Sequence, residues 1–383
     1  MWRHIASNAL SLFIVALIAV GGVIAWGKNQ YGAMGPLTQA ICVKVDRGSN
    51  MGRVSNDLAD RGAISNGSIM RIGADYADKS SQLKHGSFLV PEGASIADIV
   101  DIVTRGGAST CGTEVVYRIG INKTEIKVRQ LDPATNRFID VIEFDPTQEG
   151  VKTQYTQVRD EADTRYRVAL AEGVTSWQII QALKSADFLN GEVGELPVEG
   201  SLAPESYEVI AGSDRNELVA EMARVQSARL AEAWANRADG LPYSTPEEAM
   251  VLASIVEKET GLAEERRQVA SVFVNRLEKG MKLQTDPTVI YGVTNGQGVL
   301  GRGLRQSELR KETPYNTYVI DGLPPTPIAN PGLASIEAAL NPDDTPFIFF
   351  VANGTGGHAF ATTLADHNAN VAKWREIEAG KSD

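Results

Sequence analysis

Residues 245–286 read TPEEAMVLASIVEKETGLAEERRQVASVFVNRLEKGMKLQTD, and this stretch predicts two consecutive helices that end in a polar corner. Thr245 is a good N-cap, and Glu248 follows three residues later, where its carboxylate can complete a capping box. A glycine often ends a helix by adopting a left-handed conformation, so the second helix is expected to end at Gly280. Residues 284–286, Gln-Thr-Asp, form the corner.

Glu259 is the anomalous residue of this stretch. At about 100° per residue, apolar side chains share one face of the first helix; they are Ala249, Leu252, Ile255 and Val256. Glu259 falls on that face, whereas Glu257 points off it. Because burial disfavours the carboxylate, Glu259 should have a raised pKa and could donate a proton near neutral pH.

Two structural roles for Glu259 stay open beside the catalytic one. The end of the helix can lift its side chain clear of the core. Alternatively, an arginine of the next helix can pair with it, and Arg266 and Arg267 are both available.

The first 27 residues are interpreted as a transmembrane anchor. The segment is apolar from Ile5 to Trp26, and about 20 apolar residues suffice to span a bilayer as a helix. A cleaved signal peptide has a shorter apolar core and a small-residue exit, which Trp26 and Lys28 do not provide. Positive charge precedes the segment, so the N-terminus is expected in the cytoplasm and the rest of the chain on the other side.

Composition excludes several classes of function. A hydrophobic content of 43% over 383 residues supports a real core and two or three domains. A formal net charge of −11 argues against a nucleic-acid partner, because there is no basic excess to neutralise phosphates. His358 and His367 have no neighbouring cysteine, so no metal site is expected. Cys42 and Cys111 fit a disulfide or two separate thiols equally well.

The pattern along the chain predicts several parts after the anchor. Residues 41–107 are expected to form strand, helix, helix, strand and helix, and residues 108–165 a β-rich insertion. A looser copy of the first pattern begins near residue 166. The predicted parts are a linker at 28–40, a small α/β module at 41–107, the insertion at 108–165, a second α/β module with its connector at 166–243, and a last domain at 244–383.

The last domain contains polar loops rich in proline and a final pair of strands. Prolines hold a surface loop in a fixed extended shape, which suits a groove that must keep its form. After a helix over 333–340, the run FIFFVA predicts a buried strand, and HAFATT predicts its partner. Thr363 and Asp366 should cap a last helix that carries His367. His358, beside a glycine turn, is kept as a substrate contact and not as a catalyst.

The runs ASIVEKET, VASVFVNRL, LQTDPTVIYG, TPYNTY, GLPPTPIANPG and GGHAF, followed by HN, occur in this order. Together they resemble the YceG-like (MltG) family of inner-membrane endolytic murein transglycosylases. The resemblance covers essentially all of residues 244–383, and the N-terminal anchor agrees with the family's layout. Residues 112–164 depart from it, because they are longer and richer in strand than the family leads us to expect.

The resemblance implies an α+β fold: an N-terminal transmembrane helix, a LysM-like βααβ module at 41–107 with the β-rich insertion, and a mixed α/β catalytic domain. It also implies that the second glutamate of EKE, Glu259, is catalytic, in agreement with the helix argument. The implied reaction cleaves the β-1,4 bond between N-acetylmuramic acid and N-acetylglucosamine in nascent glycan strands, leaves 1,6-anhydro ends and needs no cofactor. One carboxyl group can act first as general acid and then as general base.

Several side chains around the predicted groove offer hydrogen-bond partners or flat rings to a sugar chain. The predicted substrate-binding residues are Gln284, Thr285, Asp286, Tyr291, Tyr315, Asn316, Tyr318, Asn330, His358 and Glu205. Glu205 belongs to SLAPESY, which resembles a family segment that could close one edge of the site. The expected partners are peptidoglycan strands, the membrane through residues 5–26, and cell-wall synthases or division proteins.

Three hypotheses follow. The first is a transglycosylase held at the inner membrane with its catalytic domain in the periplasm. The second is a muramidase that makes the same cut with water, which would require a second carboxylate such as Asp286 or Glu205. The third is a glycan-binding scaffold without activity, which a buried glutamate argues against because an unneeded buried acid costs stability.

Overall fold

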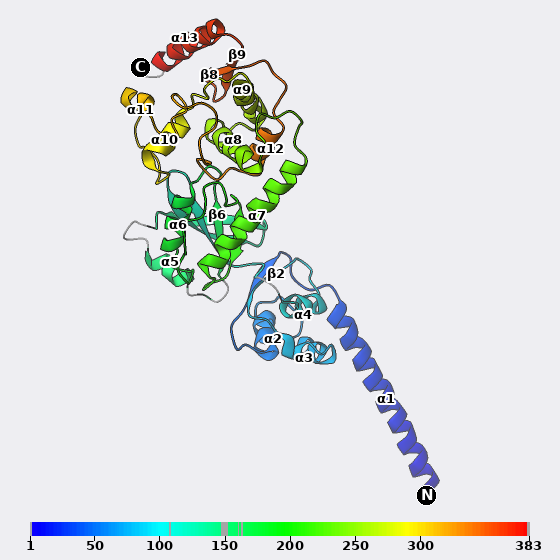
Figure 1. Ribbon diagram of the computed structural model, residues 1–383. Coiled ribbons are helices and arrows are strands. Elements are labelled where there is room, and N and C mark those ends of the chain that lie inside the picture. Colours follow the sequence, from blue (N-terminus) through cyan, green and yellow to red (C-terminus); the bar gives the residue numbers. More distant parts are fainter. Residues whose placement is uncertain (1, 107–108, 147–151, 160, 162–163, 381–383) are drawn as a thin grey trace. The chain divides into compact units, whose positions relative to one another are not determined.

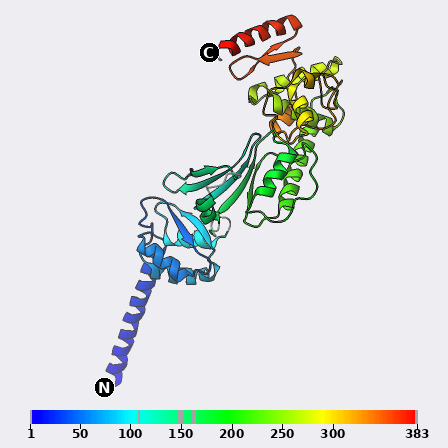
Figure 2. The same ribbon diagram turned by 90° about the vertical axis from the view of Figure 1, so that its left-hand side faces the viewer.

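The computed structural model describes residues 2–106, 109–146, 152–159, 161 and 164–380 (Figures 1 and 2). The other residues of the predicted insertion, the end of the predicted 41–107 module and the last three residues lie outside that description. The chain divides into two compact units. The first is Met1–Val115 with Lys127–Glu143 and Glu149–Arg165, and the second is Val116–Ile126 with Phe144–Gln148 and Tyr166–Asp383.

Helix α1, Trp2–Gly32, begins the first unit. Its segment Leu10–Gly32 is long and apolar enough to cross a membrane, and the 18-residue apolar window within it has no buried residue. The helix is therefore consistent with a single-pass membrane anchor. It continues past residue 27 to Gly32, so the first part of the predicted linker is helical.

The order predicted for residues 41–107 is confirmed. Strand β1 (Ile41–Val45) pairs antiparallel with β2 (Gly86–Val90), and helices α2 (Met51–Asp60) and α3 (Gly67–Tyr76) connect them. A short 3-10 turn, Ser80–Gln82, precedes β2, and α4 (Ile96–Thr104) follows it.

Local side chains explain where these helices begin and end. The Asn50 and Asn66 side chains accept hydrogen bonds from the first-turn amides of α2 and α3. Ser95 forms a capping box with Asp98 at the start of α4. Gly62, at φ +68°, follows the end of α2 in the left-handed conformation that often ends a helix. The element order is thus βααβ; its likeness to LysM stays a prediction.

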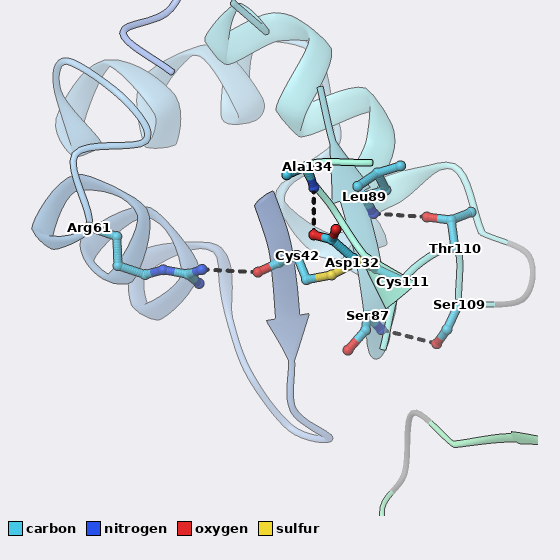
Figure 3. Close-up of a disulfide and its surroundings, with 9 residues drawn as sticks. All are labelled: Cys42, Arg61, Ser87, Leu89, Ser109, Thr110, Cys111, Asp132 and Ala134. Atoms are coloured by element: carbon cyan, nitrogen blue, oxygen red, sulfur yellow. Dashed lines mark hydrogen bonds between the residues drawn. A yellow bond between two sulfur atoms is a disulfide. The ribbon is translucent and has the colours of Figure 1, made fainter. Parts of the chain in front are cut away.

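Cys42 and Cys111 form a disulfide, which resolves the choice that the sequence left open (Figure 3). Their Cα atoms are 5.7 Å apart, within the usual range for bonded cysteines. Hydrogen bonds hold the segment before Cys111 against β2, because Ser87 N donates to Ser109 Oγ at 3.0 Å and Leu89 N to Thr110 Oγ1 at 2.9 Å (Figure 3). The disulfide therefore ties β1 to the chain that leads into the next sheet.

A five-stranded sheet follows, in the order β5-β4-β3-β6-β7. Its strands are β3 (Thr113–Ile119), β4 (Thr124–Asp132), β5 (Arg137–Phe144), β6 (Arg165–Leu170) and β7 (Ser206–Val209), and α5 (Lys152–Arg159) lies between β5 and β6 in sequence. The strand-rich character predicted for 108–165 is confirmed. However, those strands share one sheet with strands from the predicted second module, so the sequence boundary at 165 does not separate two sheets.

The second unit contains the remaining helices and a two-stranded sheet. Its elements are α6 (Ser176–Ser185), α7 (Arg215–Ala235), α8 (Pro246–Glu259), a 3-10 turn (Ala263–Glu265), α9 (Arg266–Glu278), α10 (Asp286–Thr294), α11 (Gln306–Arg310), α12 (Leu333–Leu340), β8 (Phe349–Ala352), β9 (His358–Ala361) and α13 (Leu364–Gly380). Figure 1 shows α8 among α9, α10 and α12. Strands β8 and β9 pair antiparallel as predicted, although β8 is only partly buried.

Helix α8 is the centre of this unit. The predicted capping box is present, because Thr245 accepts from Glu248 N and the Glu248 side chain accepts from Thr245 N. Ala249 to Val256 are buried without interruption, and they pack with residues of α9 and α12 in one apolar cluster. The single apolar face expected from the periodicity is therefore wrong. A helix that is apolar on all sides belongs to the interior of a domain.

Candidate active site

Glu259 is the last residue of α8 and lies just beyond the buried stretch. Its side chain is partly exposed, and its Oε1 atom accepts a hydrogen bond from the Thr285 hydroxyl. Among the residues that the structure describes, Oε2 has no hydrogen-bond partner, and it is not a buried atom. One oxygen of the carboxyl group is thus held by the protein, and the other keeps its hydrogen-bonding capacity unused.

Three buried threonines hold the corner that faces Glu259. Thr285 N donates to Thr317 Oγ1 at 3.0 Å, and the hydroxyls of Thr288 and Thr317 are 2.9 Å apart. Gln284 N donates to the Thr317 carbonyl at 3.1 Å, and Gln284 itself has φ +52°. A left-handed conformation costs a non-glycine residue on the order of 1 kcal/mol, and it persists where the surroundings fix it. The threonine network supplies that constraint, so the Thr285 hydroxyl is aimed at Glu259.

The charges around Glu259 act in opposite directions on its pKa. Burial raises the pKa above its ordinary value, and the negative charge of Asp286 raises it further. The hydrogen bond from Thr285 lowers it, and so do the electrostatic effects of His358 and Arg276. The net shift is upward. A carboxyl group with a raised pKa keeps its proton to a higher pH, which a general acid requires.

The two structural roles left open for Glu259 have different outcomes. Arg266 forms an ion pair with Glu172 at 3.8 Å and Arg267 one with Asp343 at 3.3 Å, so neither neutralises Glu259 and the arginine pairing is wrong. The prediction that the helix end lifts the side chain clear of the core is right in part, because Glu259 lies past the buried stretch and its side chain is partly exposed.

Glu257 has a different environment from Glu259. Its Oε2 atom accepts from Gly332 N at 3.0 Å and from the Ser335 hydroxyl at 2.7 Å, and both donors belong to the start of α12. The side chain therefore lies against the start of α12. It fastens α8 to α12.

The predicted tyrosines fall into two groups. The Tyr318 hydroxyl donates to Asp286 Oδ1 at 2.7 Å, directly beside the Thr285 corner. Tyr291 and Tyr315 lie against each other with ring centroids 4.9 Å apart. Burial raises the pKa of Tyr291 and Tyr318, so both phenols are neutral donors.

Asn316 and Asn330 are completely buried, and their amide groups are fully used within the protein. Asn316 donates to the Lys311 carbonyl at 2.7 Å and accepts from Tyr318 N at 3.1 Å. Asn330 accepts from Leu202 N at 2.9 Å and donates to the Val174 carbonyl at 2.9 Å. These contacts suit residues that set the shape of loops.

The last two predicted residues lie in separate surroundings. His358 Nδ1 is 2.8 Å from Glu265 Oε2, and the ring is close enough to lower the pKa of Glu259. Glu205 is exposed and forms an ion pair with Arg229. The structure thus brings Thr285, Asp286 and Tyr318 together with Glu259, while Glu205 belongs to a surface pair. Direct substrate contact by any of the ten predicted residues stays a prediction.

Glu199 is a second enclosed glutamate, which the sequence pattern did not single out. Oε1 accepts from Ser176 N at 2.8 Å and from Asn330 Nδ2 at 3.2 Å, and Oε2 accepts from the Tyr291 hydroxyl at 3.2 Å. Burial raises the pKa of this carboxyl as well. The contacts join the start of α6, the Pro-rich loop and α10.

Thr288, Thr317, Arg276 and Glu265 were also missed as contributors to the site. Arg276 is buried and donates to the carbonyls of Leu283 and Ile348, both at 2.7 Å. An arginine within the apolar run of α9 was the one available signal for it, because a buried charge needs a reason. Nothing in the local sequence distinguishes the threonines from ordinary loop residues.

Two cavities lie in this unit away from Glu259. One of about 540 Å³ is lined by residues of α7, α9 and α12, including Arg229, Arg266 and Arg267. Another of about 900 Å³ is lined by residues 198–201, α7 and the loop 322–327. Among the described residues, no three His, Cys, Asp or Glu side chains group as metal ligands would.

A family model described as the YceG-like family matches residues 144–373. The matched range is more than half of the 383 residues and contains both Glu259 and Glu199. The chain belongs to the YceG-like family. The match begins at residue 144, so the segment predicted as a second module and connector belongs to the family region together with the last domain.

Several curated relatives are named endolytic murein transglycosylase. One from Bacillus subtilis is 43% identical over 125 residues, which are 33% of this chain and 34% of that protein. One from Streptococcus pneumoniae is 26% identical over 382 residues, which are 97% of this chain and 65% of that protein. The YceG-like chain thus spans less than two thirds of the length of these relatives.

A solved structure of a putative yceG-like protein from Listeria monocytogenes is 23% identical to this chain. It matches with a TM-score of 0.47 over 86% of this chain and 98% of the other.

Proposed function

We propose that this YceG-like protein is an endolytic lytic transglycosylase of peptidoglycan in which Glu259 is the general acid and then the general base. The observation that carries the proposal is the state of the Glu259 carboxyl group. Burial raises its pKa, Thr285 orients Oε1, and Oε2 has no hydrogen-bond partner among the described residues. The names of the curated relatives supply the reaction and the substrate.

The proposed reaction breaks the β-1,4 bond from N-acetylmuramic acid to N-acetylglucosamine. Glu259 gives its proton to the glycosidic oxygen as the bond to C1 breaks, and charge develops on the sugar ring. The resulting carboxylate then accepts the proton of the sugar's own C6 hydroxyl, whose oxygen closes on C1 to form the 1,6-anhydro ring. The carboxyl group ends as it began, so one acid suffices.

Neighbouring groups support both steps. Asp286, at the positive N-terminal end of α10, is close enough to act on Glu259 and is oriented by the Tyr318 hydroxyl. Its negative charge favours the proton on Glu259 before the cut and can stabilise positive charge on the ring during it. His358 and Arg276 favour the carboxylate that follows.

A muramidase is the second candidate, and Asp286 is the observation that favours it. A retaining or inverting glycosidase needs two carboxyl groups flanking the bond, and Asp286 is a second carboxyl group beside the first. The products separate the two reactions, because hydrolysis leaves a reducing end and the transglycosylase leaves an anhydro end.

The deciding experiment uses the full chain in liposomes, supplied with purified glycan strands, beside its Glu259→Gln variant. Mass spectrometry of the products should show anhydro-muramyl ends made by the unmodified protein and absent with the variant. Reducing ends among the products would show that the protein is a hydrolase and not a transglycosylase. Full cleavage by the Gln variant would remove Glu259 from the mechanism under either reaction.

The proposed location is the inner membrane, with a cytoplasmic N-terminus and a periplasmic catalytic region. Helix α1 is consistent with an anchor, and the Cys42–Cys111 disulfide fits an oxidising compartment. At that location the enzyme would meet nascent strands and terminate their elongation. Cell-wall synthases or division proteins are the proposed protein partners, and a LysM-like role for residues 41–107 in holding glycan is part of the same proposal.

A further inference from the structure

Helix α3 carries an apolar face that the protein does not cover. Ile72 is 69% exposed and Tyr76 is 93% exposed. They are four residues apart and therefore lie one above the other on the same side of the helix. The opposite side is anchored in the core of the 41–107 module, because Met70 and Ala74 are completely buried.

This helix lies beside the end of the membrane helix. The Tyr31 ring of α1 contacts Gly73 so closely that any side chain at that position would collide with it. Helix α1 packs against both α3 and α4, and Figures 1 and 2 show it leaving the module beside them. Gly73 stands between Ile72 and Tyr76 in sequence, so the uncovered face and the contact with α1 belong to one turn of α3.

The junction between α1 and the module is packed. Gly35 N donates to the Gly93 carbonyl at 3.1 Å, and Gly93 N donates to the Leu37 carbonyl at 2.9 Å. Tyr31 and Leu37 both pack against the core of the module. The module is therefore held at a fixed height relative to α1.

That height corresponds to the surface of the membrane. From Trp26, the end of the predicted apolar run, five residues to Tyr31 advance an α-helix by about 7.5 Å. The headgroup layer on each side of a bilayer is roughly 5–7 Å thick. If the span is instead Leu10–Gly32, Tyr31 lies at its very edge. In the first case Tyr31 lies at the outer edge of the headgroup layer and in the second at its inner edge, so α3, which packs on Tyr31, lies at the membrane surface.

The charges near this face indicate how it would bind. Asp75 and Asp78 lie at the end of α3, and Lys79 is paired with Asp101. There is no basic cluster on α3 to attract anionic lipid. An exposed tyrosine with a neighbouring isoleucine instead matches the aromatic belt of membrane proteins, whose rings sit at the headgroup level.

We infer that the Ile72–Tyr76 face of α3 docks on the bilayer surface and lays the 41–107 module on the membrane beside α1. The inference rests on the proposed anchoring by α1 and not on glycan cleavage. Docking is apolar, so it does not depend on anionic lipid or on low salt. The module is then kept at the place where α1 leaves the bilayer.

The test uses the full chain in phosphatidylcholine liposomes with the disulfide oxidised, labelled with an environment-sensitive fluorophore through one added cysteine at a time. The variants are Tyr76→Cys, Ile72→Cys, Ile139→Cys and Ile18→Cys. Ile139 is a matched control, an isoleucine on β5 that is 55% exposed. Ile18 is in the middle of the predicted span and reports whether α1 is in the membrane at all.

Lipids with a quencher near the headgroup should quench the fluorescence of the labels at positions 72 and 76 several-fold more than that of the label at position 139. The difference should persist in high salt and without anionic lipid. Deep quenchers should reach position 18. Equal, weak quenching at 72, 76 and 139 with position 18 quenched would overturn the docking and leave the anchor intact. A loss of the quenching difference in high salt would contradict an apolar contact. An unquenched label at position 18 would show that α1 is not in the membrane.

Discussion

Glu199 and Glu259 are two glutamates of the same compact unit, and burial raises the pKa of both. Glu199 accepts hydrogen bonds at both oxygens, from a backbone amide, an asparagine and a tyrosine. Glu259 receives one hydroxyl at Oε1, and within the described part of the chain its Oε2 has no hydrogen-bond partner. Burial alone therefore does not distinguish these two acids, whereas unused hydrogen-bonding capacity does. Under the proposed function, that capacity is what separates the catalytic acid, Glu259, from a structural one.

The largest expected effect comes from replacing Glu259. Glu259→Gln keeps the size of the side chain and removes its proton chemistry, so cleavage should fall by about 10²–10⁴-fold, the usual contribution of general acid–base catalysis. Rates of anhydro-product formation by the full chain measure it. Glu199→Gln is the matched control and should stay close to the unmodified rate. Equal losses in both variants would contradict the assignment of roles.

The next effect concerns the stability that Glu199 provides. Glu199→Ala leaves the donors on Ser176, Tyr291 and Asn330 without their acceptor, which should lower the free energy of unfolding by about 2–4 kcal/mol. Denaturant unfolding measures it. Glu199→Gln keeps an acceptor oxygen and should recover most of the loss. Unchanged stability in the alanine variant would show that the three contacts add nothing.

A smaller effect tests the Thr285 hydroxyl. Its hydrogen bond lowers the pKa of Glu259, so Thr285→Val should raise that pKa further. A hydrogen bond to a charged group is worth about 1.5–3 kcal/mol, which corresponds to roughly 1–2 pH units. The alkaline limb of the pH–rate profile should move upward by that amount. Thr285→Ser retains the hydroxyl and should leave the limb in place, and a shift in both variants would assign the effect to packing.

The smallest effect is the pH dependence of stability. Because the pKa of Glu259 is raised in the folded protein, the folded state holds the carboxyl proton more tightly than the unfolded chain does. In the unfolded chain the pKa of a glutamate is about 4.3. The free energy of unfolding therefore falls as pH rises from the unfolded value to the folded one. Glu259→Gln has no titrating carboxyl group and does not lose this stability. Above the folded pKa, its free energy of unfolding should therefore increase relative to that of the unmodified protein. A difference that does not change with pH would contradict the raised pKa.

Much of the local structure near the site could be predicted from residues. Capping at Thr245, the stop at Gly280 and the turn into Asp286 depend on neighbours within a few positions, and all three are present. The burial pattern of α8 could not be predicted by periodicity. Helices α9 and α12 cover sides that a lone amphipathic helix would leave to solvent, so Glu257 is enclosed as well.

The sequence by itself determined the apolar helix, the order of elements in residues 41–107 and the family, because each depends on local pattern or on an ordered set of motifs. It also selected Glu259 as the candidate acid, whose catalytic role stays a prediction. Only the tertiary structure decided that Cys42 and Cys111 are bonded, that Arg266 and Arg267 pair elsewhere, and that Glu199 accepts hydrogen bonds at both of its oxygens. Those facts depend on residues far apart in the chain. Distances between such residues are determined by packing, which no short stretch of sequence encodes.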